Sequence, residues 1–345
     1  MPAPRAGTFA LLLFAALVIG TQLALSALKA DFYLTQLTMS AWYTLVALGL
    51  CLLMGYAGQV SMGHAGFFAI GGYTAAVIST AGAAPWLSVP AGVAAAALVA
   101  ILVGIPVLRL KGHYLAMATL AFGFIVSRII LGAPLFGQAD GISDVPAYHL
   151  VAGIAVSGRR ALRAQNFYLA WGVVFVGLAA ALNLVRSRTG RALRAIHGDE
   201  EAAAASGIDV ARHKLMVFVL SAVYAGLAGA CLTHFNGGIG PGEAGIMKSV
   251  RYVALVAAGG MANLWGTLAV SAVLTFLSLR GVFGLYDDAV FGAILVAIML
   301  FAPNGVFALL RGWRARRPGR VRDHAAALAD EPEPAGRSAA QVRGR

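Results

Sequence analysis

The sequence predicts an all-α protein, a polytopic transmembrane helical bundle of about ten spans in which some helices are broken by glycine. The first observation is composition: 60% of the 345 residues are hydrophobic, 12% are charged and the mean hydropathy is +0.80. A soluble domain with a polar shell is much less apolar. The second is the length of the apolar runs, about 20 residues each, which is what crossing about 30 Å of hydrocarbon requires. The third is that basic residues gather at the ends of these runs. Residues 1–310 are therefore predicted to form one transmembrane domain in a lipid bilayer.

Apolar runs give the order of the spans. The run 9–28 is long enough to cross and has no small-residue cleavage signal, so it is expected to be a retained first helix. Two glycine-rich stretches are less regular, 65–81 and 250–282, and splitting the second at Gly259-Gly260 brings the count to ten crossings. The seven regular runs are 9–28, 35–54, 88–108, 114–132, 166–185, 214–235 and 288–309.

Charge asymmetry favours the count of ten. Lys and Arg accumulate in 109–113, in 186–214 and in the tail from 311, and short cytoplasmic loops are rich in these residues. With ten crossings all three segments and the N-terminus lie on the cytoplasmic side. Segment 133–165 then lies outside, although its three arginines make it more basic than the rule expects. Residues 311–345 are predicted to be a basic cytoplasmic tail, disordered over about its last 25 residues.

Charge and cysteine usage exclude several classes of function. The formal net charge of +12 would suit a nucleic-acid partner in a soluble domain, but here the basic residues are topology signals, so no nucleic acid is expected. Cys51 and Cys231 lie in separate apolar runs without metal-ligand spacing. They are expected to be packing residues, with neither a disulfide nor a metal site.

Two glycine-rich breaks interrupt the helical pattern. Segment 55–66 holds four glycines with Gln59, Ser61 and His64, and segment 257–266 centres on Gly259-Gly260. Non-helical backbone survives in a bilayer only where protein or a water-filled cavity satisfies it, so both breaks should line the interior. Paired breaks also indicate internal repeats that flank a pathway. The sequence leaves open whether the two halves are such repeats. The candidate translocation-path residues are Gly58, Gln59, Ser61, Gly63, His64, Gly259 and Gly260.

His64 has two interpretations, a hydrogen-bonded structural residue or a proton relay or metal ligand. The structural interpretation is favoured, because a lone histidine near a glycine-rich break is more often a hydrogen-bonded structural residue. No metal site is expected anywhere in the chain.

The segment 186–213, called the coupling loop below, is predicted to hold a short helix. Asp199, Glu200 and Glu201 suit the electropositive start of an alanine-rich helix, and Gly207 suits its C-terminal cap. Such a helix is compact enough to dock into a soluble partner. A simple positively charged loop is the alternative, and composition alone does not separate the two.

Four motifs in this order resemble the LivM-type permease subunits of branched-chain amino-acid ABC transporters, within the high-affinity amino-acid uptake family. The similarity covers about residues 40–310, and the motifs are 55–68, 112–120, 190–207 and the Gly259-Gly260 break. The resemblance implies that Ala202 to Gly207 form the coupling helix that fits a cleft in an ATPase subunit. His197-Gly198 departs from the family pattern, which could weaken a salt bridge to the ATPase. The residues carried over to ATPase coupling are Gly190, Arg191, Asp199, Glu200, Ala202 and Gly207.

The resemblance also implies partners and an energy source. It implies a bacterial plasma (inner) membrane location, a homologous second permease subunit, two cytoplasmic ABC ATPase subunits and a periplasmic or extracellular substrate-binding protein. The sequence has no GxxxxGK[ST] motif, so ATP is expected to be used by partner subunits, with no catalysis and no cofactor bound directly by this chain.

Several substrates and mechanisms stay open. Branched-chain amino acids are the family default, but related permeases carry urea, short amides, other amino acids or aromatic acids. An ion-coupled secondary transporter would need a mid-membrane carboxylate or cation site, and few ionisable residues are expected deep in the spans. A membrane-embedded enzyme is disfavoured because HExxH and GxSxG are absent.

Overall fold

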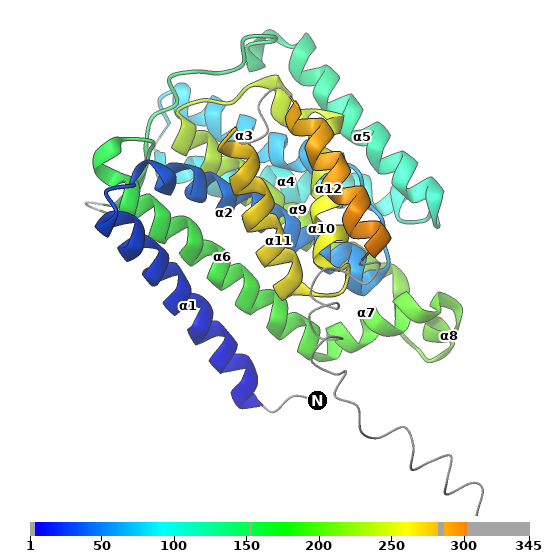
Figure 1. Ribbon diagram of the computed structural model, residues 1–345. Helices are drawn as coiled ribbons and strands as arrows, with labels where there is room; N and C mark the ends of the chain where they lie inside the picture. Colours follow the sequence, from blue (N-terminus) through cyan, green and yellow to red (C-terminus); the bar gives the residue numbers. More distant parts are fainter. Residues whose placement is uncertain (1–3, 84, 152–153, 282–285, 302–345) are drawn as a thin grey trace, which may run out of the picture.

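The computed structural model describes residues 4–83, 85–151, 154–281 and 286–301, and most of these are helical. Helix α1 runs along the outside of the bundle beside α6, while α2 lies in its interior (Figure 1). The long helices are α1 (Pro4–Ala27), α2 (Phe32–Cys51), α3 (His64–Thr80), α4 (Pro85–Val107), α5 (His113–Gly132), α6 (Arg163–Arg186), α9 (Val210–Asn236), α10 (Ile246–Gly259), α11 (Leu264–Leu279) and α12 (Asp287–Phe301). The short ones are η1 (Leu52–Tyr56), η2 (Pro134–Phe136), η3 (Arg160–Leu162), α7 (Arg188–Gly198), α8 (Glu200–Ala205) and η4 (Pro241–Ala244).

Ten helices fall where the ten crossings are predicted, and six of them are long and apolar enough to span a membrane. The other four are shorter in the described residues, so the count of ten remains a prediction. The end of the predicted span 288–309 and the tail 311–345 lie outside the described residues. The six long spans are Phe9–Ala27, Phe32–Tyr56, Trp86–Val107, His113–Gly132, Arg160–Arg186 and Val210–Asn236.

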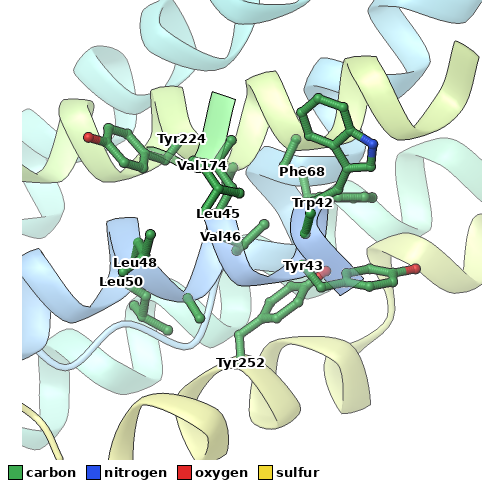
Figure 2. Close-up of a cluster of buried hydrophobic side chains, with 14 of the residues drawn as sticks. Trp42, Tyr43, Leu45, Val46, Leu48, Leu50, Phe68, Val174, Tyr224 and Tyr252 are labelled. Atoms are coloured by element: carbon green, nitrogen blue, oxygen red, sulfur yellow. The ribbon is translucent and has the colours of Figure 1, made fainter. Parts of the chain in front are cut away.

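The core of the bundle forms around α2. In the span Phe32–Tyr56, 89% of the most apolar window is buried, against 6% for the first span. Figure 2 shows α2 side chains such as Trp42 and Leu45 among residues of α3, α6, α9 and α10. Apolar side chains that face lipid are not exposed to water, so α1 can lie at the periphery of the bundle with its leucines exposed.

Small residues bring α3, α4 and α9 close together. A Cβ added at Gly71 would overlap the backbone of Gly226, and one at Gly92 would overlap the carbonyl of Gly71. A Cβ at Gly229 would overlap the carbonyl of Phe68. Close backbone approach of this kind is the usual packing of membrane helices, since dispersion contacts rather than the hydrophobic effect hold them together.

Both predicted glycine breaks are confirmed. The helix begun by α2 continues through the π-helical turn η1, ends at Tyr56, and α3 starts at His64. The stretch 250–282 is divided as expected: α10 ends at Gly259 and α11 starts at Leu264. Gly260 has φ +96°, a backbone conformation that L side chains rarely adopt, so the break requires glycine there.

A two-stranded hairpin is a departure from the all-α prediction. Strands β1 (Tyr148–Val151) and β2 (Ile154–Val156) pair antiparallel within segment 133–165. Aromatic and branched residues in the two strands favour an extended backbone. A β-bridge between Ile142 and Ile239 ties the same segment to the chain that follows α9.

Candidate functional site

The two glycine breaks pack directly on each other. A Cβ at Gly55 would overlap the carbonyl oxygen of Met261, so only glycine allows the two backbones to meet. The hydroxyl of Tyr56 donates to the carbonyl oxygen of Ala262 at 2.8 Å, and the thiol of Cys51 donates to that of Met261 at 3.2 Å. These bonds satisfy carbonyl groups of the second break, as a non-helical segment within a bilayer requires. The sequence predicts both breaks, and the structure adds that they touch.

His64 is a hydrogen-bonded residue of the interior, as its structural interpretation predicts. Its imidazole is fully buried, with Nδ1 3.1 Å from Ser61 Oγ and Nε2 2.6 Å from Ser221 Oγ. A neutral imidazole offers one donor and one acceptor, which matches two hydroxyl partners in either tautomer. Gly63 lies beside it, where a Cβ would come 2.5 Å from the carbonyl oxygen of Thr119 in α5.

The other predicted path residues divide between the interior and one end. Gln59 is 2% exposed, and neither polar atom of its side chain has a hydrogen-bond partner among the described residues. Gly259 and Gly260 are buried within the second break. Gly58 is exposed instead, and its absent Cβ would lie 2.6 Å from Nδ1 of His197 in α7. Passage of a substrate along these residues stays a prediction.

Sequence reasoning missed one polar cluster, formed by Tyr43, Glu243 and Lys248. The Lys248 ammonium donates to Glu243 Oε1 at 3.0 Å and to the Tyr43 hydroxyl at 3.2 Å. The Tyr43 hydroxyl in turn lies 3.2 and 3.3 Å from the two carboxylate oxygens. The expectation of few ionisable groups deep in the spans did not anticipate this cluster, because its two charged residues lie between the predicted spans 214–235 and 250–282. Glu243 lies in η4 and Lys248 in the first turn of α10, so hydropathy alone assigns both to an external loop. The fold instead brings both side chains to Tyr43 of α2.

The coupling loop begins with a helix that sequence reasoning also missed. Ser187 caps α7 by accepting from the backbone N–H of Gly190, which is a usual N-cap geometry. This serine is the feature of the sequence that could have indicated the start of α7. Leu193 and Ile196 are buried against the bundle, while Arg191 is exposed. A Cβ at Gly190 would overlap the backbone carbonyl of Val185, so α7 is seated tightly on the end of α6.

The predicted helix of the coupling loop is α8. Asp199 caps it by accepting from the N–H groups of Glu201 and Ala202 at 2.8 and 3.0 Å. These backbone donors, first that of Ala202, lower the pKa of the Asp199 carboxyl because they stabilise its charged form. Gly207 follows the helix with φ +82°, the left-handed conformation of a C-terminal cap.

Ion pairs hold α8 against its surroundings. The buried Lys214 ammonium of α9 pairs with Glu200, while Lys111 and Glu201 form a looser, exposed pair at 3.9 Å. Ala202 and Gly207 remain exposed. Figure 1 shows α7 and α8 projecting from one end of the bundle, toward the same end as the start of α1.

The architecture is that of a polytopic membrane protein, because six of its helices are long and apolar enough to cross a bilayer. Broken helices that meet inside the bundle are typical of membrane transporters. A model of one family, branched-chain amino acid transport system / permease component, matches residues 32–302. The chain belongs to that family, which confirms the resemblance found in the sequence.

Relatives agree with the family. The chain is 31% identical over 307 residues to the high-affinity branched-chain amino acid transport system permease protein LivM of Salmonella typhimurium, covering 83% of this chain and 72% of that protein. It is 32% identical over 296 residues to LivM of Escherichia coli K12, covering 79% and 69%. Identity to the permease protein LivH of Escherichia coli K12 is 27% over 291 residues, covering 78% and 92%. No solved structure matches the chain.

Proposed function

We propose that this chain is the membrane-spanning permease subunit of an ABC importer that carries branched-chain or related amino acids into the cytoplasm. The observation that carries the proposal is the family match over residues 32–302, together with relatives named for high-affinity branched-chain amino acid transport. The chain itself is proposed to be non-catalytic, with no cofactor or metal bound directly. ATP is used by partner subunits.

The coupling loop is proposed to receive the motion of the ATPase. Arg191, Asp199, Ala202 and Gly207 are exposed on α7, α8 and the turn that follows, where a partner can reach them. Buried Leu193 and Ile196 and the Lys214–Glu200 pair fix the two helices to the bundle. A rigid attachment of this kind supports transmission, because a push on α8 moves the helices it is bonded to.

One contact extends this route toward the proposed path. His197 of α7 lies against Gly58, at the exposed end of the first break. We propose that ATP-driven movement of α7 and α8 reaches the two glycine breaks through this contact. Gln59, Ser61, Gly63 and His64 follow Gly58 inward, and Gly259 and Gly260 lie in the second break.

The proposed assembly has a homologous second permease subunit, two cytoplasmic ABC ATPases and a periplasmic or extracellular substrate-binding protein. Its place is the bacterial plasma (inner) membrane, with ten spans in residues 1–310, both termini in the cytoplasm and 311–345 as the tail. The charge asymmetry of the loops supports this orientation.

Two alternatives make different predictions. A permease of the same family for urea, short amides or aromatic acids would keep the ATP dependence and change the substrate. An ion-coupled secondary transporter would keep working on an ion gradient alone. The Glu243 carboxylate is the observation in favour of this alternative, because such a transporter needs a cation site in the membrane. A carboxylate already paired with lysine is a poor cation site, however.

The test is uptake of radiolabelled leucine by vesicles that hold the complete complex and its binding protein. We expect uptake to stop when ATP is exhausted and to persist when ionophores collapse the ion gradients. Uptake that continues without ATP while a gradient is maintained would overturn the ABC mechanism. ATP-dependent uptake of urea, an amide or an aromatic acid in place of leucine would overturn the substrate.

The coupling role is tested with Gly207→Arg. Gly207 has φ +82°, so its replacement also strains the backbone. The control is therefore Gly82→Arg, because Gly82 has φ +79° and open space around it in the loop at the end of α3. We expect Gly207→Arg to insert normally and to lose co-purifying ATPase, while Gly82→Arg retains it. Normal import by Gly207→Arg would contradict the assignment of the coupling loop.

A further inference from the structure

The cluster of Tyr43, Glu243 and Lys248 lies deep in the bundle. Tyr43 is near the middle of the 25-residue span Phe32–Tyr56. At 1.5 Å per residue it is about 17 Å from the start of that span, or about half of a bilayer's hydrocarbon thickness. Glu243 and Lys248 are brought to this depth because η4 and the start of α10 pack against α2 and α3. An ionisable pair at mid-membrane is costly and usually marks a functional site.

The charged groups are partly accessible rather than sealed. The side chains of Lys248 and Glu243 are 30% and 23% exposed, whereas Tyr43 is 6% exposed. Full burial of such a pair would cost desolvation energy that its attraction often fails to repay, and partial exposure leaves both charged groups within reach of solvent. A small solute that reaches the interior can therefore contact both charges.

Aromatic residues surround the cluster, and one of them, Tyr252, has a hydroxyl without a hydrogen-bond partner among the described residues. The Tyr43 ring is 5.9 Å from that of Phe68 and 6.2 Å from that of Tyr252, and Figure 2 shows Tyr43 and Tyr252 side by side. Tyr252 follows Lys248 by four residues on α10 and so shares its helix face. Its hydroxyl is buried, and among the described residues it has no hydrogen-bond partner, a state that polar groups rarely keep without a ligand or water.

The arrangement is complementary to a zwitterion. A carboxylate and an ammonium 3.0 Å apart present both signs of charge at one point, and the tyrosine hydroxyl bridges them. We propose that Tyr43, Glu243 and Lys248 form a transient contact site for a free α-amino acid in the translocation path. The α-ammonium group of the solute binds Glu243, its α-carboxylate binds Lys248, and the mutual ion pair is re-formed when the solute leaves.

This inference rests on the proposed amino-acid import and deepens it. A site that closes on itself when empty binds weakly, because the solute must replace an existing ion pair at each end. Weak binding suits conduction, which requires that a solute can leave as readily as it enters. Selection of the amino acid can then remain with the binding protein.

The direct test is labelling with a diazirine analogue of leucine in vesicles that import leucine. Light should attach the analogue to peptides from Phe32–Tyr56 and 241–252, and excess leucine should suppress the label. Leucine-protectable label confined to other segments, or none in vesicles that import leucine, would overturn the contact site. Vesicles that import no leucine in the presence of ATP would instead refute the proposed function itself.

Variants give a second readout that does not depend on labelling. Tyr43→Phe and Glu243→Gln should each reduce leucine imported per ATP hydrolysed by about tenfold, the loss expected for one charge-assisted hydrogen bond. The control is Tyr33→Phe, which removes a hydroxyl that accepts from Arg280 at 3.0 Å in an exposed contact at the start of α2. Full import per ATP by Tyr43→Phe, or an equal loss in Tyr33→Phe, would contradict the proposal.

Discussion

His64 Nε2 lies 2.6 Å from Ser221 Oγ, and this bond joins the start of α3 to the middle of α9. Both side chains are fully buried, so neither can exchange its partner for water. The same imidazole reaches Ser61 in the first glycine break through Nδ1. His64 thereby fixes the break to α9, whose N-terminal end carries the Lys214 that holds α8.

Replacing Ser221 by alanine should destabilise the bundle without changing its fold. The imidazole nitrogen would be buried without a partner, which costs about 1–3 kcal/mol of unfolding free energy. The measurement is the melting temperature of the detergent-solubilised complex. The control is Thr21→Ala, an exposed hydroxyl bonded only within α1. Equal melting temperatures for the two variants would show that the His64 bond contributes nothing.

Replacing Gly58 by alanine should weaken coupling between ATP hydrolysis and uptake. Gly58 has φ +67°, which costs a side-chain-bearing residue about 1–2 kcal/mol, and the new Cβ would also press on His197. The double variant Gly58→Ala with His197→Ala removes the clash between the new Cβ and His197, but it leaves the backbone strain at position 58. We expect leucine imported per ATP to fall in the single variant and to recover in part in the double one. No recovery would show that the two residues are not mechanically linked.

Replacing Glu200 and Glu201 by glutamine should have unequal effects. Glu200→Gln leaves the buried Lys214 ammonium, 7% exposed, without its carboxylate, and should cost about 2 kcal/mol. Glu201→Gln removes only an exposed pair, which contributes about 0–1 kcal/mol. Limited proteolysis of the coupling loop in membranes should be faster for Glu200→Gln alone. Equal cleavage rates would contradict the tight attachment of α8.

The cap of α8 should depend on pH in one direction. The pKa of Asp199 is lowered from its ordinary value of 3.8, since backbone N–H groups stabilise the carboxylate. The cap is therefore complete above about pH 4 and is lost as pH falls through the lowered pKa. Hydrogen exchange should show protection of the Glu201 and Ala202 amides that decreases only below this range. Asp199→Asn accepts the same bonds at every pH and should remove the dependence.

The sequence predicts the helical class, the positions of the helices and both breaks, because each depends on local properties. Run length against bilayer thickness places the spans, and glycine at Gly260 permits a conformation that other residues avoid. Asp199 and Gly207 predict α8 because capping involves only neighbours in the chain. The hairpin of β1 and β2 was missed, since a short apolar stretch between helices carries a weak signal.

Tertiary structure decided which residues meet. Gly55 and Met261 are more than 200 positions apart in the chain. Gly55 has no Cβ, which leaves room for the Met261 carbonyl, but no local sequence pattern indicates that these two residues meet. Tyr43 and Lys248 form their bond because η4 returns the chain into the bundle, which hydropathy cannot show for a polar segment. Local energies thus determine the elements of this permease. The contacts that make its interior depend on packing between distant segments, and only the fold specifies that packing.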